Sequence, residues 1–375
     1  MPETAPETPP LRRIGWPLVA GKTDPHWQAV FAAHPGTRPA RVVEQHRSGY
    51  VVADAPDAAI KAESPPEWMR PPSFKRSNVP NHERAAVGDW VLLDGDKIVA
   101  LLPRRSAIKR GAAGEHYHQQ VIAANIDSVF VVVGLDDDFN PRRIERYLLL
   151  VGSGGAQPVI VLTKADTDGA DAQAALAALS QLDAPVFALN AKDRASVAAL
   201  DPWLGEGRSV VLVGSSGAGK STLTNTLSGV EKMKTGAVRQ SDSRGRHTTT
   251  HRALIALPTG ACLIDTPGMR ELKPTGEEEM SEGGFADVEA LAERCKFRDC
   301  RHGNEPGCAV RAAVERDERD PARLDPARLS SYLKLRDEVA GAAGKLAARQ
   351  AERKTEARVQ DKALKKRLSE KHGKR

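Results

Sequence analysis

The distribution of apolar residues divides the chain into regions of different architecture. Between residues 40 and 102, short β-type runs alternate with polar segments, and the runs lie at 41–43, 50–52, 90–93 and 98–102. Gly-Asp pairs at 88–89 and 95–96 can form the turns between such strands, as in small β-barrels. The pattern predicts an OB-like β-barrel over residues 38–115, with the Pro-rich stretch 55–82 as a long loop. An RNA-binding barrel and a purely structural β-domain both fit this segment.

A different rhythm begins near residue 120, where strands and helices alternate. Strands are expected at 126–133, 158–162, 186–189, 209–213 and 261–264, and helices at 141–152, 170–182 and 220–227. This alternation is typical of a parallel sheet covered by helices. The sequence therefore predicts a multi-domain α/β protein, with an α/β domain over residues 116–278.

The two ends of the chain lack both patterns. Residues 1–37 are rich in Pro, Thr and Ala without a sustained period, which predicts a poorly ordered lead with at most one helix near 27–33. A helical domain is expected at 279–341, followed by a basic helical tail at 342–375. The tail holds 12 Lys and Arg against 4 Asp and Glu, which gives it a net charge of +8. The whole chain has a net charge of +6, so the residues outside the tail carry −2. Such a tail suits a nucleic acid, although a solvated charged helix would have the same composition.

Length and composition limit the class of protein. A chain of 375 residues exceeds what one hydrophobic core usually serves, so two or three domains are expected. The sequence contains no apolar run of roughly 18 residues, the length of a membrane span, and its N-terminus lacks the layout of a secretory signal. A soluble, cytoplasmic monomer without membrane contact is predicted.

The strongest chemical signal is a glycine-rich segment that follows the apolar strand 210–213 and opens a helix. Backbone N–H groups of such a P-loop surround the phosphates of a nucleotide, and the helix N-terminus adds its dipole. Lys220 is expected to reach the β- and γ-phosphates, and Ser221 to coordinate Mg²⁺. The predicted phosphate-binding residues are Gly214, Ser215, Ser216, Gly217, Ala218, Gly219, Lys220, Ser221 and Thr222.

Two further segments indicate the base. The first follows the strand ending at 162, resembles the NKxD guanine motif, and consists of Thr163, Lys164, Ala165 and Asp166. A carboxylate at Asp166 accepts hydrogen bonds from guanine N1–H and its amine, whereas adenine N1 carries no proton, so GTP and GDP are the expected ligands. Thr163 stands where asparagine is usual. The second segment resembles the SAK loop that contacts guanine through its backbone, and consists of Asn190, Ala191 and Lys192.

The remaining nucleotide contacts are expected after the P-loop. Asp265 to Gly268 reads Asp-Thr-Pro-Gly and resembles the DxxG motif, in which Asp265 would hold Mg²⁺ through water and the Gly268 N–H would meet the γ-phosphate. Thr250 is the predicted switch threonine that completes the Mg²⁺ shell. Together Lys220, Ser221, Thr250, Asp265 and Gly268 form the expected catalytic set.

One position argues for slow hydrolysis. Met269 occupies the place where many GTPases have a glutamine that orients water. A group from a switch or a partner is then needed, and His247 and His251 are candidates, although a solvated or RNA-facing histidine fits equally well.

A Cys/His cluster follows the α/β region. Three thiolates and an imidazole can close a tetrahedral structural Zn²⁺ site, and one such site per chain is expected. Its predicted ligands are Cys295, Cys300, His302 and Cys308, whereas Cys262 lies in a predicted strand and is interpreted as a buried apolar residue.

The order of the motifs is unusual, because the base-reading segments at 163–166 and 190–192 precede the P-loop at 214–221. An ordinary GTPase has the opposite order, so the domain is circularly permuted. This order, the N-terminal β-domain and the Cys/His cluster together resemble the RsgA (YjeQ) family of permuted GTPases over roughly residues 40–340. The resemblance implies a partner in the small ribosomal subunit and its rRNA, with GTP hydrolysis promoting release after a late maturation step. The alternatives are a P-loop kinase or ATPase, and an RNA-binding module whose hydrolysis is vestigial.

Overall fold

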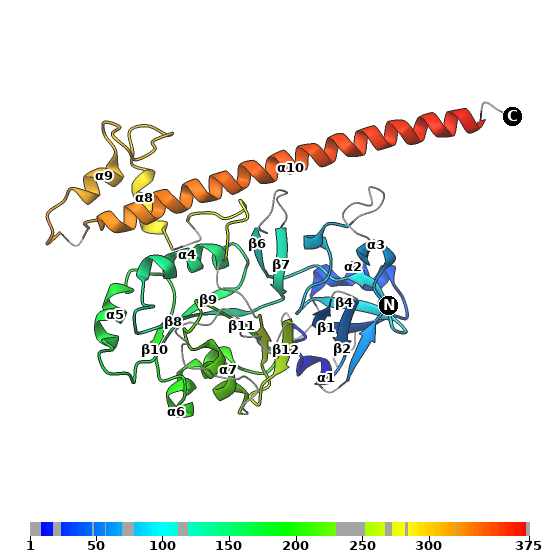
Figure 1. Cartoon of the computed structure of the whole chain (residues 1–375), viewed down its shortest axis with the longest axis horizontal. Coiled ribbons are helices and arrows are strands. Elements are labelled where there is room, and N and C mark those ends of the chain that lie inside the picture. The colour runs from blue at the N-terminus through cyan, green and yellow to red at the C-terminus, as the bar shows by residue number, and fades with distance from the viewer. Residues whose placement is uncertain are drawn as a thin grey trace, which may run out of the picture.

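The computed structural model describes residues 9–17, 24–46, 49–56, 58–69, 79–111, 119–229, 252–266, 272–281, 284–320 and 322–372. These residues form an N-terminal β-barrel, an α/β unit and a C-terminal helical unit that ends in a long helix (Figure 1). Within these ranges, no helix combines the length and the apolar character needed to span a bilayer.

The barrel is a ring of five strands. They are β1 (Arg38–His46), β2 (Gly49–Ala53), β3 (Ala59–Ala62), β4 (Trp90–Asp94) and β5 (Lys97–Leu101). β1 pairs antiparallel with β2 and β4, while β2 pairs with β3 and β4 with β5. A parallel bridge between Glu63 and Lys97 joins the end of β3 to β5 and completes the ring. Its interior holds apolar residues of the strands, among them Val42, Val52 and Val91.

The segment between β2 and β4 differs from the predicted loop at 55–82. It contains β3, the short helix α3 (Pro66–Met69) and the 3-10 turn η1 (Asn81–Glu83). Trp68 of α3 packs edge-on against Tyr50, with ring centroids 5.8 Å apart. Pairing of β3 with β2 and this ring contact order residues 58–69, whose Pro-rich composition indicates a loop.

The N-terminal segment is also more ordered than predicted. It forms α1 (Pro9–Arg12) and α2 (Pro25–Ala33), and the second of these confirms the helix expected near 27–33. The ring of Trp16 lies 5.0 Å from that of Trp27 and 4.6 Å from that of Trp90. All three indoles are buried, so this cluster fixes residues 9–17 and 24–37 against β4. A poorly ordered lead is wrong for these described residues, because large aromatic side chains supply the burial that the composition does not indicate.

The sheet of the α/β unit has the order β10-β9-β8-β11-β13-β12. Its strands are β8 (Ser128–Gly134), β9 (Gln157–Thr163), β10 (Val186–Ala188), β11 (Ser209–Val213), β12 (Arg252–Ala256) and β13 (Cys262–Asp265). All neighbouring strands are parallel except β12 and β13. The five strands expected here are confirmed, with ends shifted by at most two residues, and β12 is an addition.

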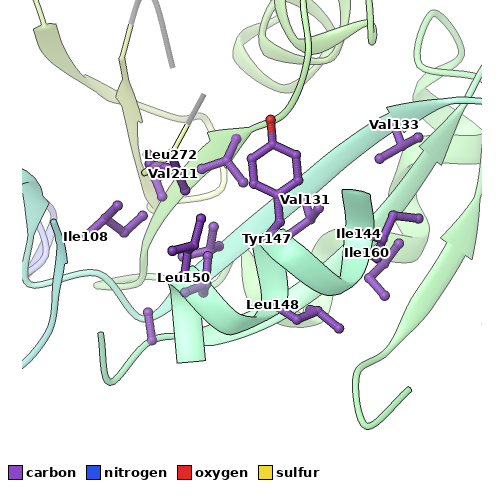
Figure 2. Packing of buried hydrophobic residues seen from close by; sticks show 14 of the residues in the cluster. Ile108, Val131, Val133, Ile144, Tyr147, Leu148, Leu150, Ile160, Val211 and Leu272 are labelled. Carbon is purple, nitrogen blue, oxygen red and sulfur yellow. The ribbon is translucent and has the colours of Figure 1, made fainter. Parts of the chain in front are cut away.

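Helices cover both faces of this sheet. They are α4 (Pro141–Gly152), α5 (Ala172–Ala178), α6 (Arg194–Val197), η2 (Ala198–Trp203) and α7 (Lys220–Ser228). α4 has the predicted bounds because Asn140 caps its first N–H groups and Pro141 begins it. Figure 2 shows Ile144 and Leu148 of this helix with Val131 and Ile160 of the strands beneath. α5 is shorter than the predicted 170–182, because Asp171 caps its start and the chain leaves the helix after Ala178.

A hairpin of β6 (Ala107–Gly111) and β7 (Gln119–Ala124) links the barrel to the α/β unit. Ile108 and Ile122 belong to the same buried cluster as Tyr147, so the predicted boundary at 115–116 falls inside a hairpin that packs with the α/β core. In addition, β12 pairs with β1, with Glu44 opposite Ala253. The barrel and the α/β sheet are therefore continuous.

The C-terminal unit comprises α8 (Ala286–Ala292), α9 (Ala309–Val314) and α10 (Pro326–His372). The buried guanidinium of Arg328 on α10 donates to Glu145 of α4 at 2.8 Å and to Asp287 of α8 at 2.7 Å, which fastens this unit to the α/β unit. α10 runs unbroken through residues 341–342, so the basic tail continues a helix that begins in the C-terminal unit (Figure 1).

Candidate functional site

The P-loop lies at the carboxyl edge of the parallel strands, between β11 and α7. Gly214 packs so closely on β8 that a Cβ there would lie 2.1 Å from the Val132 carbonyl oxygen, and Gly219 has a φ of 89°. Both positions therefore require glycine. The Lys220 ammonium donates to the carbonyl of Gly214 at 2.8 Å and to that of Ser215. The lysine thus already lies across the loop that is expected to hold phosphates.

Thr163 connects the base-reading segment to the P-loop. This residue ends β9, is fully buried, and donates its hydroxyl to the Ala218 carbonyl at 2.7 Å. A threonine in place of asparagine therefore still supplies a donor to the P-loop backbone. The departure of Thr163 from the NKxD motif therefore does not remove the hydrogen bond between this segment and the P-loop.

A second set of contacts joins the other base-reading loop. Thr226 of α7 donates its hydroxyl to the Ala191 carbonyl at 2.6 Å. The Ala165 N–H donates to the Leu189 carbonyl at 3.4 Å, and the Lys192 N–H to the Asn190 side chain at 2.9 Å. The segments 163–166, 190–192 and 214–222 are therefore brought together at one edge, with the carboxyl group of Asp166 exposed.

Two site residues escaped the sequence analysis. Asp138 accepts a hydrogen bond from the Ser215 hydroxyl and one from the Gly134 N–H at 3.4 Å. Asp136 forms an ion pair with Lys164. Partial burial acts to raise the pKa of Asp136, but its hydrogen bond with Lys164 and the charge of that lysine lower it overall. The available signal was an acidic run directly after a buried strand, at the edge where ligands of α/β sheets bind.

Asp265 ends β13 on the same edge. Burial raises its pKa, while the nearby Lys220 charge and the Thr266 N–H act to lower it. A divalent cation would oppose the effect of burial, and the Ser221 hydroxyl and the Asp265 carboxylate are hard oxygen donors of the kind that Mg²⁺ accepts. The donor chemistry therefore fits Mg²⁺. The predicted residues Thr250 and Gly268, as well as His247, His251 and Met269, lie outside the described residues.

The cysteine cluster has the geometry of a metal centre. The ligand atoms of Cys295, Cys300, His302 and Cys308 all lie within 4.8 Å of one another. The sulfurs of Cys295 and Cys308 are 3.9 Å apart, and His302 Nδ1 lies 3.7 and 3.5 Å from them. Tetrahedral coordination with metal–sulfur bonds of about 2.3 Å places neighbouring sulfurs about 3.8 Å apart. Burial lowers the pKa of His302, which favours the neutral imidazole that a metal needs. Cys262, by contrast, is buried in β13, as expected.

Replacing Thr163 tests the contact between the two loops. Thr163→Val keeps the shape of the side chain but leaves the buried Ala218 carbonyl without its donor. We expect GTP affinity to fall about tenfold, since an unsatisfied buried acceptor costs roughly 1–3 kcal/mol, while the preference for guanine over adenine remains. Thr163→Ser keeps the hydroxyl and should bind GTP as the wild type does. Equal GTP affinities of the valine and serine variants, measured by titration calorimetry, would contradict this role.

Comparison with known proteins identifies the family and the relatives that this chain resembles. Residues 101–275 match the family model described as RsgA GTPase. The proteins named "Small ribosomal subunit biogenesis GTPase RsgA" from Xanthomonas axonopodis pv. citri (strain 306) and Xanthomonas campestris pv. campestris (strain B100) are each 69% identical to this chain over 355 residues, which is 94% of both partners in each comparison.

Two solved structures share the fold. YjeQ from Thermotoga maritima superposes with a TM-score of 0.57, 23% identity, and coverage of 81% of this chain and 99% of that one. YloQ, described as a circularly permuted GTPase, superposes with a TM-score of 0.54 and 23% identity. This match covers 82% of the present chain and 96% of the YloQ chain. At this identity the likeness shows the fold alone, and it confirms the permutation inferred from the order of the motifs.

Proposed function

The chain belongs to the RsgA GTPase family, and we propose that it binds the small ribosomal subunit and couples GTP hydrolysis to late maturation of that subunit and to its own release. As a member of this family the chain is a GTP hydrolase, which excludes the kinase or ATPase alternative. The observation that carries the proposal is 69% identity to relatives named for small-subunit biogenesis over 94% of the chain. A cytoplasmic location and a monomeric state follow as expectations.

The proposed nucleotide site assigns a role to each described motif. Lys220 neutralises the β- and γ-phosphates, the backbone of 214–222 surrounds them, and Asp166 reads guanine with support from the loop 190–192. When bound with GTP, Mg²⁺ neutralises charge that develops on the phosphate oxygens. Ser221 and Asp265 would hold it, together with the expected Thr250. Buried Thr163, half-buried Asp138 and exposed Asp136 hold the loops in place through the hydrogen bonds and the ion pair described above.

The proposed metal of the cysteine cluster is one structural Zn²⁺ per chain. Sulfur and imidazole donors at tetrahedral spacing favour zinc over Mg²⁺ or Ca²⁺, which prefer oxygen. Four protein ligands leave no open position, so a structural rather than a catalytic role is favoured.

The barrel is proposed to be an OB-like module that contacts rRNA. In support, its five strands follow the ring order β1-β2-β3-β5-β4, with β3 and β5 joined in parallel. A five-stranded ring of this order is compatible with the OB-type barrels that bind oligonucleotides. β12 follows residues 230–251, which include the predicted switch threonine, and it pairs with β1 of the barrel. A change in the switch segment between the GTP and GDP states could therefore reach the barrel through β12.

The proposal is tested by measuring GTP hydrolysis with and without purified small subunits. We expect slow turnover by the protein alone and clear stimulation by small subunits, with no stimulation by large subunits. Turnover that small subunits leave unchanged would contradict the proposed partner while leaving the GTPase assignment intact.

Asp166 is expected to determine the base. Asp166→Asn should shift the preference from GTP toward XTP, because an amide can donate a hydrogen bond to the 2-oxo group of xanthine and a carboxylate cannot. Competition binding with GTP and XTP measures this change. The matched control is Asp168→Asn, an exposed aspartate two positions further on. An unchanged GTP/XTP ratio in Asp166→Asn would show that another group reads the base.

The basic end of α10 is expected to strengthen binding to rRNA. Gly276 packs against the backbone of Ala342 and Ala343, so a truncation should keep these two alanines. Removing residues 344–375 takes away the whole net charge of +8 of the tail. Each Lys or Arg that neutralises a phosphate releases a counterion, so we expect weaker rRNA binding with a flatter salt dependence. Intrinsic GTP hydrolysis should stay nearly unchanged. Filter binding at several salt concentrations measures both effects, and a truncated protein with the full-length affinity and slope would indicate a merely solvated helix.

A further inference from the structure

The loop between the first two cysteines of the cluster exposes an aromatic ring. Phe297 lies between Cys295 and Cys300 and is 41% exposed. Among the described residues, the other large hydrophobic side chains exposed to this degree are the aliphatic Val99 and Leu176. A single exposed apolar side chain is common on protein surfaces, so the charges and the backbone around this ring decide what it can bind.

Basic residues lie on both sides of Phe297 in the sequence. Arg294, Lys296, Arg298 and Arg301 are all exposed, and the Lys296 ammonium lies 5.6 Å from the centre of the Phe297 ring. Within the ranges that the structure describes, no carboxylate lies within ion-pair distance of these four side chains. The loop 294–301 also contains the exposed Asp299, so it presents a flat apolar face beside four basic side chains and one acidic one.

The backbone of the loop is held in shape. The Lys296 N–H donates to the Gly307 carbonyl at 3.1 Å, and the Cys300 N–H to the Phe297 carbonyl at 3.3 Å. The Arg301 N–H donates to the Glu305 carboxylate at 3.1 Å. These bonds fix the backbone that carries the ring, so little backbone ordering entropy is lost when a partner binds.

We propose that the loop 294–301 is a binding site for single-stranded RNA, in which Phe297 stacks on an unpaired base and the surrounding Lys and Arg side chains contact phosphates. Aromatic rings stack with any base, and basic groups beside them neutralise the backbone, which is the common mode of single-strand recognition. The core of a protein interface, in contrast, is a contiguous and largely apolar patch, and a single exposed ring supplies little of it. The proposal deepens the proposed function, on which it rests, by naming a specific rRNA contact.

The placement of the loop in the fold suits this role. α10 packs on α4 through Arg146 and Glu338, whose side chains form an ion pair at 2.5 Å. In Figure 1 the chain between α8 and α9 stands on the side of α10 away from α4. The loop is therefore separated from the nucleotide site by α10, and its RNA contact can be altered without touching the P-loop.

The test compares variants of the full-length protein in binding a fluorescein-labelled single-stranded oligoadenylate, followed by fluorescence anisotropy. Phe297→Ala should weaken binding about tenfold, in line with the cost of losing one stacked base. Phe297→Trp should bind at least as tightly as the wild type. Leu176→Ala removes a hydrophobic side chain on α5 that is 37% exposed, close to the 41% of Phe297, and should have no effect. Arg298→Gln should weaken binding and reduce its salt dependence. Metal content equal to that of the wild type shows that each variant keeps its fold.

Wild-type affinity of Phe297→Ala for the oligonucleotide, at unchanged metal content, would overturn the proposal. If this variant lost affinity for small subunits but not for the oligonucleotide, the partner of the ring would be a ribosomal protein, and the RNA site would be wrong. If the wild type were not stimulated by small subunits but the Phe297 variants still differed on the oligonucleotide, the proposed partner would fail and the RNA site would stand.

Discussion

Lys220→Ala should reduce kcat/KM for GTP hydrolysis by on the order of 10²–10³, the usual effect of removing one group that stabilises transition-state charge. The ammonium donates to the P-loop carbonyls of Gly214 and Ser215, and its charge partly offsets the burial that raises the pKa of Asp265. Its loss removes the cation that compensates the β- and γ-phosphates, where negative charge concentrates during transfer. Single-turnover hydrolysis and nucleotide binding together separate a loss of affinity from a loss of rate.

Two further variants make this result interpretable. Lys97→Ala removes an exposed lysine of the barrel and should leave intrinsic hydrolysis unchanged. Lys220→Arg keeps the charge in a larger planar group, and we expect only partial activity because the loop is shaped around a compact ammonium. Unchanged kcat/KM in Lys220→Ala would contradict the assignment of 214–221 as the phosphate site.

The sequence predicted the α/β unit well because its signals are local. A buried strand, a glycine-rich turn and a helix follow one another at 209–228, and each is visible without knowledge of the rest of the fold. The contacts that hold the site together are different, because they join residues distant in sequence. Thr163 and Ala218 are an example, as are Asp138 and Ser215. Their chemistry could be named only after the topology had placed β8, β9 and β11 side by side.

The same distinction explains the failures elsewhere. Trp16 and Trp27 lie in a Pro-rich segment without periodicity, yet they are buried because Trp90 of the barrel provides a surface for them. β3 has only four residues, and its pairing with β2 and the bridge from Glu63 to β5 stabilise it. Composition describes what a segment would do alone, and tertiary contacts decided both cases.

Loss of the metal from the cysteine cluster should loosen the C-terminal unit. Structural zinc contributes folding free energy directly, on the order of 10–16 kcal/mol in small zinc-binding domains. Cys308 is buried, caps α9 through its sulfur, and belongs to the same buried cluster as Phe285 and Tyr332. The helices α8 and α9 are only seven and six residues long and would not be stable alone, so the metal adds to the order that their buried cluster provides.

Cys300→Ser should therefore lower the bound zinc well below one per chain and speed hydrogen exchange over residues 284–320. Intrinsic GTP hydrolysis should change little, because the P-loop belongs to a separate core. Stimulation by small subunits should fall, because the loop 294–301, the proposed RNA contact, loses its fixed backbone conformation without the metal. Cys262→Ala, at the cysteine buried in β13, is the matched control and should keep the wild-type zinc content. Wild-type protein purified without chelator and found free of zinc would refute the metal assignment, and unchanged hydrogen exchange in zinc-depleted Cys300→Ser would show that protein packing alone maintains the unit.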